Sequence, residues 1–135
     1  MRKTAQYIVL GAIALAIGIL AGCGTLPGIV GAMVNAGTVD WEADAQPWKG
    51  MHNQIVTFVL PPLGRPSGVW GTDVYTDDSS IGSAAVHRGL ITFAKGGTVK
   101  IRILPGRSSY AGSARNGIIS DDWDEWDGSF EFVTP

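Results

Sequence analysis

A charge-free stretch near the N-terminus divides the sequence into two unlike parts. No charged residue occurs over 4–39, and every Asp and Glu lies at or after Asp40. Within this stretch, 14 mostly aliphatic residues at 8–21 follow the basic pair Arg2 and Lys3. As a helix, that run would span about 21 Å, which is less than the roughly 30 Å hydrocarbon core of a bilayer. The pattern is typical of a cleaved signal peptide and not of a permanent membrane span.

The apolar run ends in Leu20-Ala21-Gly22-Cys23, which resembles the lipobox of bacterial lipoproteins. The resemblance implies cleavage before Cys23, diacylglycerol on its thiol, and a fatty acyl chain such as palmitate on the new amine. Two or three acyl chains form a stable membrane anchor. Residues 1–22 are therefore predicted to be a lipoprotein signal peptide, and Cys23 is predicted to be the lipidation site.

The alternative is an uncleaved anchor helix that keeps Cys23 as a buried thiol. Pro27 and several nearby glycines oppose the continuation of such a helix. Both interpretations place the rest of the chain outside the cytoplasm and on a membrane. Gly24, rather than Asp, follows the cysteine, and the resemblance to lipoprotein sorting signals then favours the outer membrane in a cell with two membranes.

Beyond Cys23, the composition is that of one small domain without disulfides. The chain has 135 residues and a single Cys, so the core alone must stabilise the domain. A net charge of −2 and a pI near 5.5 argue against a nucleic-acid-binding protein, and no motif calls for a cofactor. Residues 23–48, rich in Gly, Ala and Val without a clear period, are expected to form the lipidated N-terminus and a tether. Residues 49–135 are expected to fold.

One short helix is predicted at 81–88. It follows Asp77-Asp78-Ser79-Ser80, in which Asp or Ser can cap the first amides, and it precedes Gly89, which can adopt the left-handed exit. Ile81, Ala84, Ala85 and Arg88 share one face of this helix, where small residues permit close approach to a sheet.

Four segments read as strands, and the whole pattern predicts an α+β domain with antiparallel strands and one central helix. The segments are Ile55–Leu60, Leu90–Phe93, Thr98–Leu104 and Ser129–Val133. The third alternates most clearly, because its apolar residues point one way while Lys100 and Arg102 point the other. Glu131 is expected to face one of these two cations across neighbouring strands.

Several sequence blocks from residue 69 onward occur in a characteristic order. They are Val69-Trp70-Gly71-Thr72-Asp73-Val74-Tyr75, Asp78-Ser79-Ser80-Ile81, Ala84-Ala85-Val86-His87, Leu104-Pro105-Gly106-Arg107-Ser108-Ser109-Tyr110, Gly112-Ser113, Arg115-Asn116-Gly117 and Trp126-Asp127-Gly128-Ser129-Phe130. Over roughly residues 50–133, these blocks resemble the LCCL domain family.

The resemblance implies a central helix wrapped by twisted β-sheets and an extracellular binding module that is not a catalyst. Some members of the family have been linked to the binding of lipopolysaccharide. Animal members carry four cysteines in disulfides, one of them typically just after the Ser-Ser-Ile block. This sequence has Gly82 at that position and no cysteine elsewhere in the domain.

Motifs for catalysis are missing from the sequence, so the chain is not predicted to be an enzyme. The stretch Gly106-Arg107-Ser108-Ser109 lacks the second glycine of a nucleophile elbow. Only His52 and His87 could act as general bases, and neither has a metal-binding spacing. His87 lies late in the predicted helix, where packing or the helix C-terminus explains it better than catalysis.

Acidic residues gather near the C-terminus. Five carboxylates lie within seven residues, at Asp121, Asp122, Asp124, Glu125 and Asp127. Such oxygen clusters suit calcium, but the spacing fails the EF-hand pattern. A solvated acidic loop is the favoured interpretation, and a weak calcium site at Asp121, Asp122, Asp124 and Asp127 is the alternative hypothesis.

Aromatic and basic residues near this loop are the candidates for ligand contacts. Trp123 could stack on a sugar ring at the surface, whereas Trp70 and Trp126 are expected to fill the core. Arg107 and Arg115, which flank Ser108, Ser109 and Tyr110, could bind phosphate or carboxylate groups. The alternative for both arginines is internal pairing with the acidic loop. The predicted ligand-binding residues are thus Trp123, Arg107, Arg115 and Tyr110.

Together these features predict a membrane-anchored envelope lipoprotein with one LCCL-like domain that binds a glycan, a lipopolysaccharide-type lipid or a protein. One alternative is a structural or assembly lipoprotein that docks to another envelope protein. A hydrolase is the least favoured alternative, because no nucleophile and base are paired in the sequence.

Overall fold

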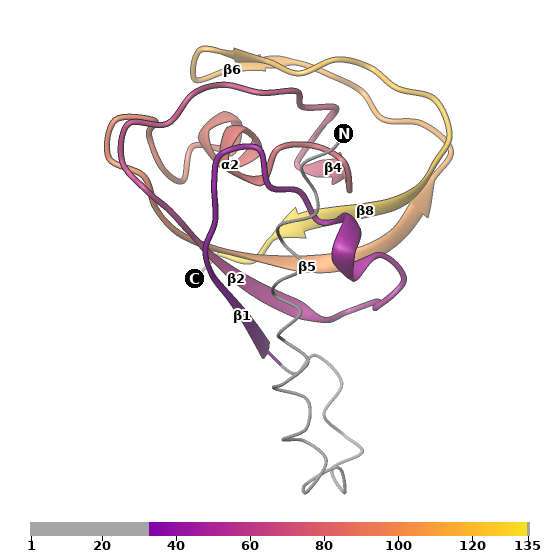
Figure 1. Ribbon diagram of the computed structural model, residues 1–135. Coiled ribbons are helices and arrows are strands. Elements are labelled where there is room, and N and C mark those ends of the chain that lie inside the picture. Colours follow the sequence, from indigo (N-terminus) through magenta and orange to yellow (C-terminus); the bar gives the residue numbers. More distant parts are fainter. Residues whose placement is uncertain (1–32, 135) are drawn as a thin grey trace, which may run out of the picture.

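The computed structural model describes residues 33–134, which form one sheet, one short helix and a separate hairpin (Figure 1). The predicted signal peptide and lipidation site, with the first part of the tether, lie outside the described residues. The elements are β1 Met33–Thr38, η2 Gln46–Trp48, β2 Ile55–Leu60, β3 Gly71–Thr72, β4 Val74–Thr76, α2 Ile81–Arg88, β5 Gly97–Arg107, β6 Ala114–Arg115, β7 Ile118–Ile119 and β8 Trp126–Phe132.

The main sheet has six strands in the order β1-β2-β5-β8-β4-β3. All neighbouring pairs are antiparallel except β1 and β2, which run parallel. Figure 1 shows this sheet curving beneath α2. Residues of α2 and of the strands belong to the same hydrophobic core cluster. The α+β prediction, with one central helix packed on a largely antiparallel sheet, is confirmed.

The prediction of a tether over 23–48 is wrong for residues 33–48, which belong to the folded unit. Met33–Thr38 form β1 beside β2, and Trp41, Ala43, Ala45 and Trp48 are buried. The sequence pattern does not reveal that these residues belong to the folded unit, and the reason is physical. The register of β1 shifts between Asn35 and Gly37, and the buried residues after it lie in an irregular loop and a 3₁₀ turn. Such a path produces neither a period of two nor a period of 3.6.

The helix forms where the caps predicted it. The Ser80 hydroxyl accepts a hydrogen bond from the amide of Ser83 at 3.0 Å, and Gly89 ends the helix with φ 88°. Burial extends around the helix beyond the one predicted face, because every residue from Ile81 to His87 is buried. Packing explains why residue 82 of the helix is a glycine, since a Cβ there would overlap the Trp41 ring.

The two longest strands confirm the alternation seen in the sequence, and both run further than predicted. Val99, Ile101 and Ile103 on β5 are buried, as are Phe130 and Phe132 on β8. On the outer side, Nη1 of Arg102 donates to Oε2 of Glu131 at 3.0 Å, as expected for a cross-strand pair. These strands form the centre of the sheet.

The prediction of a strand at Leu90–Phe93 is wrong. Only Thr92 makes a bridge there, to Gly96. The neighbouring carbonyls of Phe93 and Ala94 accept hydrogen bonds from the amides of Gly64 and Leu63 instead. The apolar side chains of this segment are explained by packing, because Phe93 lies against the Trp41 ring with 5.1 Å between ring centroids.

Within residues 33–134, the structure contains no helix of the length and apolarity needed to cross a membrane.

Candidate functional site

The five tryptophans separate into a buried pair and a surface group. Trp41 and Trp48 are buried in the core. Trp70 and Trp126 are only partly buried, and Trp123 has a relative exposure of 46%. The prediction that Trp70 and Trp126 fill the core is therefore wrong, because residues of the supposed tether fill it instead. Trp123 is at the surface, as predicted.

Trp70, Trp123 and Trp126 lie against one another and are called here the tryptophan surface. Trp123 is the central member, since its ring centroid lies 6.2 Å from that of Trp70 and 6.4 Å from that of Trp126. The interplanar angles of 68° and 77° correspond to edge-to-face contacts. Such contacts are favourable for aromatic rings and hold their orientation while leaving other ring faces uncovered.

Different segments position the three rings. Trp70 forms a parallel bridge with Asp121, and its amide donates to the Ser79 hydroxyl at 3.0 Å. Trp123 forms an antiparallel bridge with Tyr110, through two backbone hydrogen bonds of 2.8 and 2.9 Å. Trp126 begins β8. The backbone of each of the three tryptophans is thus held in place by the fold itself, without a ligand.

Trp126 is also fixed through its side chain. Its Nε1 donates to Oδ1 of Asp77 at 2.8 Å, and Nζ of Lys49 lies 5.4 Å from its ring centroid. The Lys49 ammonium donates to Asp127 at 2.6 Å and lies 3.6 Å from Oδ2 of Asp77. Gly128 leaves room for the Asp77 carboxylate, because a Cβ at this position would overlap Oδ2. The indole is therefore held from its edge and from one face.

Asp77 and Asp127 both interact with Lys49, but the pKa values of their carboxyl groups are shifted in opposite directions. The Asp77 side chain is only 1% exposed, and its Oδ2 accepts no hydrogen bond within residues 33–134. Burial raises the pKa of Asp77, although the Trp126 hydrogen bond and the Lys49 charge oppose that rise. The hydrogen bond and charge of Lys49 lower the pKa of exposed Asp127. Burial lowers the pKa of Lys49, but its two carboxylate partners outweigh this and raise it.

The predicted ligand-binding residues do not all come together. Tyr110 is buried, and its hydroxyl accepts from the Arg107 amide and donates to the Trp126 carbonyl, both at 3.1 Å. Burial raises the pKa of this phenol. Tyr110 therefore supports the backbone under the tryptophan surface.

The two predicted arginines lie in different places. Arg107 pairs with Trp126 between β5 and β8, and its guanidinium lies 6.0 Å from the Tyr110 ring centroid. It borders the tryptophan surface. Arg115 forms an ion pair with Asp73 at 2.8 Å, and this pairing raises the pKa of Arg115. Arg115 is thus paired within the domain, but with Asp73 and not with the acidic loop of the alternative interpretation.

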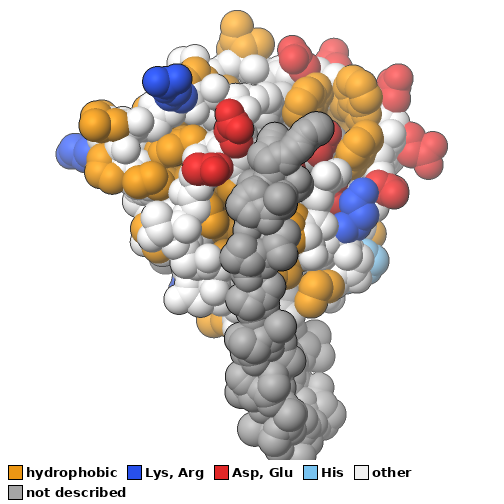
Figure 2. All heavy atoms as spheres, viewed as in Figure 1, with side chains coloured by type: hydrophobic (Ala, Val, Ile, Leu, Met, Phe, Trp, Pro, Cys, Tyr) orange, Lys and Arg blue, Asp and Glu red, His pale blue; other side chains and the backbone are white. Residues whose placement is uncertain are grey.

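Acidic residues lie close to the tryptophan surface. Asp121 bridges Trp70, Asp122 accepts a hydrogen bond from the Gly112 amide at 2.8 Å, and Asp127 pairs with Lys49. Figure 2 shows an apolar patch bordered by acidic side chains. In the part of the chain that the structure describes, no three His, Cys, Asp or Glu side chains form a group suited to a metal ion. The calcium hypothesis at Asp121, Asp122, Asp124 and Asp127 therefore has no support from the geometry.

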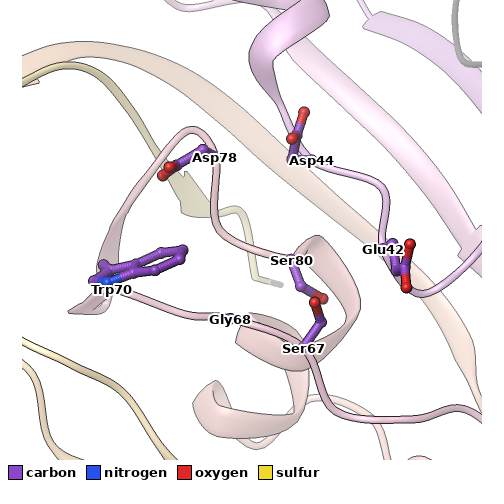
Figure 3. A pocket seen from close by; sticks show the side chains of 7 residues that line it. All are labelled: Glu42, Asp44, Ser67, Gly68, Trp70, Asp78 and Ser80. Atoms are coloured by element: carbon purple, nitrogen blue, oxygen red, sulfur yellow. The ribbon is translucent and has the colours of Figure 1, made fainter. Parts of the chain in front are cut away.

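A hollow of about 290 Å³ adjoins Trp70. Figure 3 shows Trp70 on one side of it and Glu42 across from it, with Ser80, the N-cap residue of α2, between them and Asp78 on the loop beside Trp70. The lining consists of Glu42, Asp44, Ser67, Gly68, Trp70, Asp78 and Ser80. Three acidic residues and one tryptophan thus contribute to the lining of this hollow.

His87 has a structural environment. It is fully buried, and its Nδ1 lies 2.9 Å from the Tyr75 hydroxyl. Its Nε2 lies 3.0 Å from the carbonyl oxygen and 3.2 Å from the hydroxyl of Ser113. These contacts connect α2 to β4 and to the segment before β6, which agrees with the packing role expected from the sequence.

Sequence reasoning missed Lys49, Asp77 and the hollow. In the sequence, Trp123 and Trp126 lie among several acidic residues, and this pattern could have indicated a surface site. Lys49 is 28 positions from Asp77 and 78 positions from Asp127 in the chain, so no local pattern could connect these three residues.

The fold and the sequence comparisons agree on the class of protein. A model of the LCCL domain family matches residues 48–130, and the chain belongs to this family. The chain is similar to cochlin from Cavia porcellus, with 45% identity over 75 residues that cover 53% of this chain and 14% of cochlin. It is also similar to human vitrin, with 44% identity over 62 residues that cover 46% of this chain and 9% of vitrin. The chain thus spans about a seventh or less of these relatives' length.

Proposed function

We propose that this chain is a membrane-anchored envelope lipoprotein whose LCCL domain binds a glycan on the tryptophan surface and catalyses no reaction. The observation that carries the proposal is the edge-to-face cluster of Trp70, Trp123 and Trp126, whose central ring is nearly half exposed. Aromatic faces beside hydrogen-bonding groups are suited to sugar rings, which present apolar C–H faces and polar edges.

The rigidity of the tryptophan surface supports a binding role. The Trp126 indole is held by Asp77 and Lys49, and the Trp123 backbone is paired with Tyr110. A site that is ordered before binding loses little conformational entropy when a ligand arrives. The carboxylates of Asp122 and Asp127, although partly engaged, lie where they can accept hydrogen bonds from sugar hydroxyls.

The extracytoplasmic location and the lipid anchor are parts of the same proposal. The lipobox-like Leu20-Ala21-Gly22-Cys23 supports lipidation at Cys23, and the family supports a position outside the cytoplasm. The outer membrane is the proposed destination in a cell with two membranes. Cys23→Ala is expected to abolish metabolic labelling with palmitate and to leave an uncleaved precursor. Normal processing of this variant would contradict the proposed anchor.

The binding function can be tested with the full-length chain in a non-ionic detergent. Envelope glycans, including peptidoglycan fragments and lipopolysaccharide, are titrated while tryptophan fluorescence and the melting temperature are followed. A ligand at a hundred times its dissociation constant stabilises the folded state by about 2.7 kcal/mol. For a domain of this size, that corresponds to a rise in melting temperature on the order of ten degrees.

Variants locate the binding surface. Trp123→Ala is expected to weaken glycan binding by at least about tenfold, because it removes the central and most exposed ring. Leu63→Ala is the matched control, since Leu63 is 85% exposed and is not part of the tryptophan surface. Equal binding by both variants would contradict this location of the site. A panel with no response, together with a cooperative melt, would contradict the glycan proposal and favour docking to another envelope protein.

A further inference from the structure

The main sheet is covered by the helix on one side only. In Figure 1, α2 lies on one side of the sheet, and strand residues that point to that side, such as Phe58, Ile101 and Phe130, are buried. Alternate residues of the strands point to the other side, because successive side chains of a strand alternate. That side is called here the outer face, and it consists of Met33, Asn35, Ile55, Thr57, Val59, Lys100, Arg102 and Glu131. In the described part of the chain, none of these eight residues is buried.

The register of the strands determines which outer-face residues are neighbours. Met33 lies beside Ile55, and Ile55 lies beside Arg102. Arg102 in turn lies beside Glu131 on β8. Met33 is 58% exposed, so its apolar side chain is in contact with solvent at the edge of the sheet. The outer face is thus apolar at β1 and β2 and charged at β5 and β8.

The charges on the outer face differ from those on the whole chain. This face has two cations, Lys100 and Arg102, and one acid, Glu131. Glu131 is paired with Arg102 at 3.0 Å, whereas no ion pair of Lys100 is found within residues 33–134. The whole sequence has 12 acidic and 10 basic residues, so the outer face carries an excess of positive charge on an acidic protein. Such a face is complementary to an anionic surface.

The proposed lipid anchor is attached close to this face. Nine residues separate Cys23 from Met33, which is the first described residue and part of the outer face. Even a fully extended chain of that length spans only about 30 Å, and a random coil of that length averages about 15–18 Å. The radius of gyration of a domain of about 100 residues is about 13 Å. An anchor at Cys23 therefore holds the β1 edge of the sheet near the bilayer.

We infer that the outer face of the sheet rests on an anionic phospholipid bilayer, with Met33 and Ile55 at the headgroup boundary and Lys100 against lipid phosphates. This inference rests on the proposed lipid anchor, which supplies the proximity to the bilayer. Two observations select this face: the chain from Cys23 enters it at Met33, and its excess charge is opposite to that of the headgroups. Anionic lipids attract basic side chains over about a Debye length, ~10 Å at 0.1 M ionic strength.

This orientation leaves the tryptophan surface accessible. Trp126 pairs with Arg107 at the far end of β5, seven residues beyond Lys100. At about 3.3 Å per residue, the two positions are about 23 Å apart along the strand. The acidic residues beside Trp123 would also be repelled by anionic headgroups. The lipid-facing and ligand-facing parts of the domain are thus distinct.

Fluorescent labels on single cysteines test the orientation. Cys23 is the only cysteine in the sequence, and its thiol is acylated in the proposed lipoprotein, so an introduced cysteine is the only free thiol. Thr57→Cys places a label on the outer face beside Lys100, and Ser109→Cys is the matched control at an exposed position next to Tyr110. The palmitoylated protein is reconstituted in phosphatidylcholine–phosphatidylglycerol vesicles that carry a nitroxide quencher on the lipid headgroups. The label at position 57 is expected to lose most of its fluorescence, while the label at position 109 keeps it.

The role of the Lys100 charge is tested in the same assay. Lys100→Gln, introduced together with Thr57→Cys, is expected to lower the ratio of docked to undocked orientations about fivefold, the factor that one basic side chain contributes at an anionic surface. Lys95→Gln is the matched control, since Lys95 is also exposed but lies outside the outer face. An equal effect of both substitutions would overturn the inference in favour of a general charge effect.

The remaining outcomes distinguish the inference from the proposed anchor. If the chain incorporates no palmitate, the lipid anchor fails, and the inference built on it fails too. If the chain is palmitoylated but the two labels are quenched equally, or neither is quenched, the anchor stands and the orientation is overturned. A label at position 57 that is shielded from aqueous iodide but not quenched by the lipids would also overturn it. That result would indicate that a second copy of the chain, or residues 24–32, covers the outer face.

Discussion

The buried and surface tryptophans show how one residue type serves two purposes in a small domain. Trp41 is surrounded by positions that cannot carry a side chain, because a Cβ at Gly64 or at Gly82 would overlap its ring. Its Nε1 donates to the Pro61 carbonyl at 2.9 Å, so the indole is both packed and hydrogen-bonded. In contrast, the Trp126 Nε1 donates to the carboxylate of Asp77, and its ring lies at the edge of the fold.

The contrast teaches where stability and binding lie in this domain. A domain without disulfides depends on burial of large side chains, which stabilises the folded state most when no polar atom is left unpaired. Trp41 meets that requirement in the core, and Trp48 is buried there too. The tryptophan surface leaves apolar area in contact with solvent, and such area is commonly a site of interaction. Substitutions in the two groups should therefore separate stability from binding.

The largest expected effect on stability is that of Trp41→Ala. Removing this buried ring leaves a cavity against α2 and removes the contact with Phe93. The free energy of unfolding is expected to fall by about 3–5 kcal/mol, measured by denaturant titration. A loss below about 1 kcal/mol would show that Trp41 does not belong to the stabilising core.

A smaller loss is expected from Gly82→Ala, although alanine is the better helix former. The added methyl group would overlap the Trp41 ring, and overpacking of this kind costs about 1–3 kcal/mol. A double-mutant cycle with Trp41→Phe isolates the cause. If the smaller ring does not reduce the cost of the added methyl, the close approach of helix and ring is not its origin.

The pH dependence of Asp77→Asn sharpens the comparison at Trp126. Burial raises the pKa of Asp77, so the folded state binds a proton more readily than the unfolded state. The stabilising contribution of protonation is complete below the unfolded pKa of about 3.9 and is lost as the pH rises through the folded value.

The wild-type chain should therefore gain stability relative to Asp77→Asn as the pH falls from neutral toward about 4. The asparagine side chain of this variant keeps an oxygen acceptor for the Trp126 indole. The Asp127–Lys49 pair is present in both chains, so its opposite pH dependence cancels in the difference. Denaturant titrations at several pH values measure this. A difference that does not change with pH would contradict the raised pKa.

The smallest effect on stability is expected from Trp123→Ala. Its ring is exposed, and its backbone hydrogen bonds to Tyr110 do not involve the side chain. The loss in unfolding free energy should stay below about 1 kcal/mol, while glycan binding weakens as described above. A destabilisation as large as that of Trp41→Ala would remove the distinction between the two groups.

How much could be predicted depended on how local the determining interactions were. The helix at 81–88 was predictable because Ser80 and Gly89 act within one turn of it. The alternation on β5 and the pair Arg102–Glu131 were predictable because one face of the sheet is buried. The predictions of a tether over 33–48 and of a strand at 90–93 were wrong, because the structure of these segments depends on distant partners such as β2 and Gly64.

By itself, the sequence determined the family, the central helix with its two caps, and the alternating strands of the sheet, because each depends on residues close together in the chain. Only the tertiary structure decided which tryptophans lie inside. Burial is set by what packs around a side chain, and here Trp41 and Trp48 pack into the core while Trp70, Trp123 and Trp126 lie outside it. It also joined Lys49 to Asp77 and Asp127, because charges far apart in sequence attract one another only after folding brings them together.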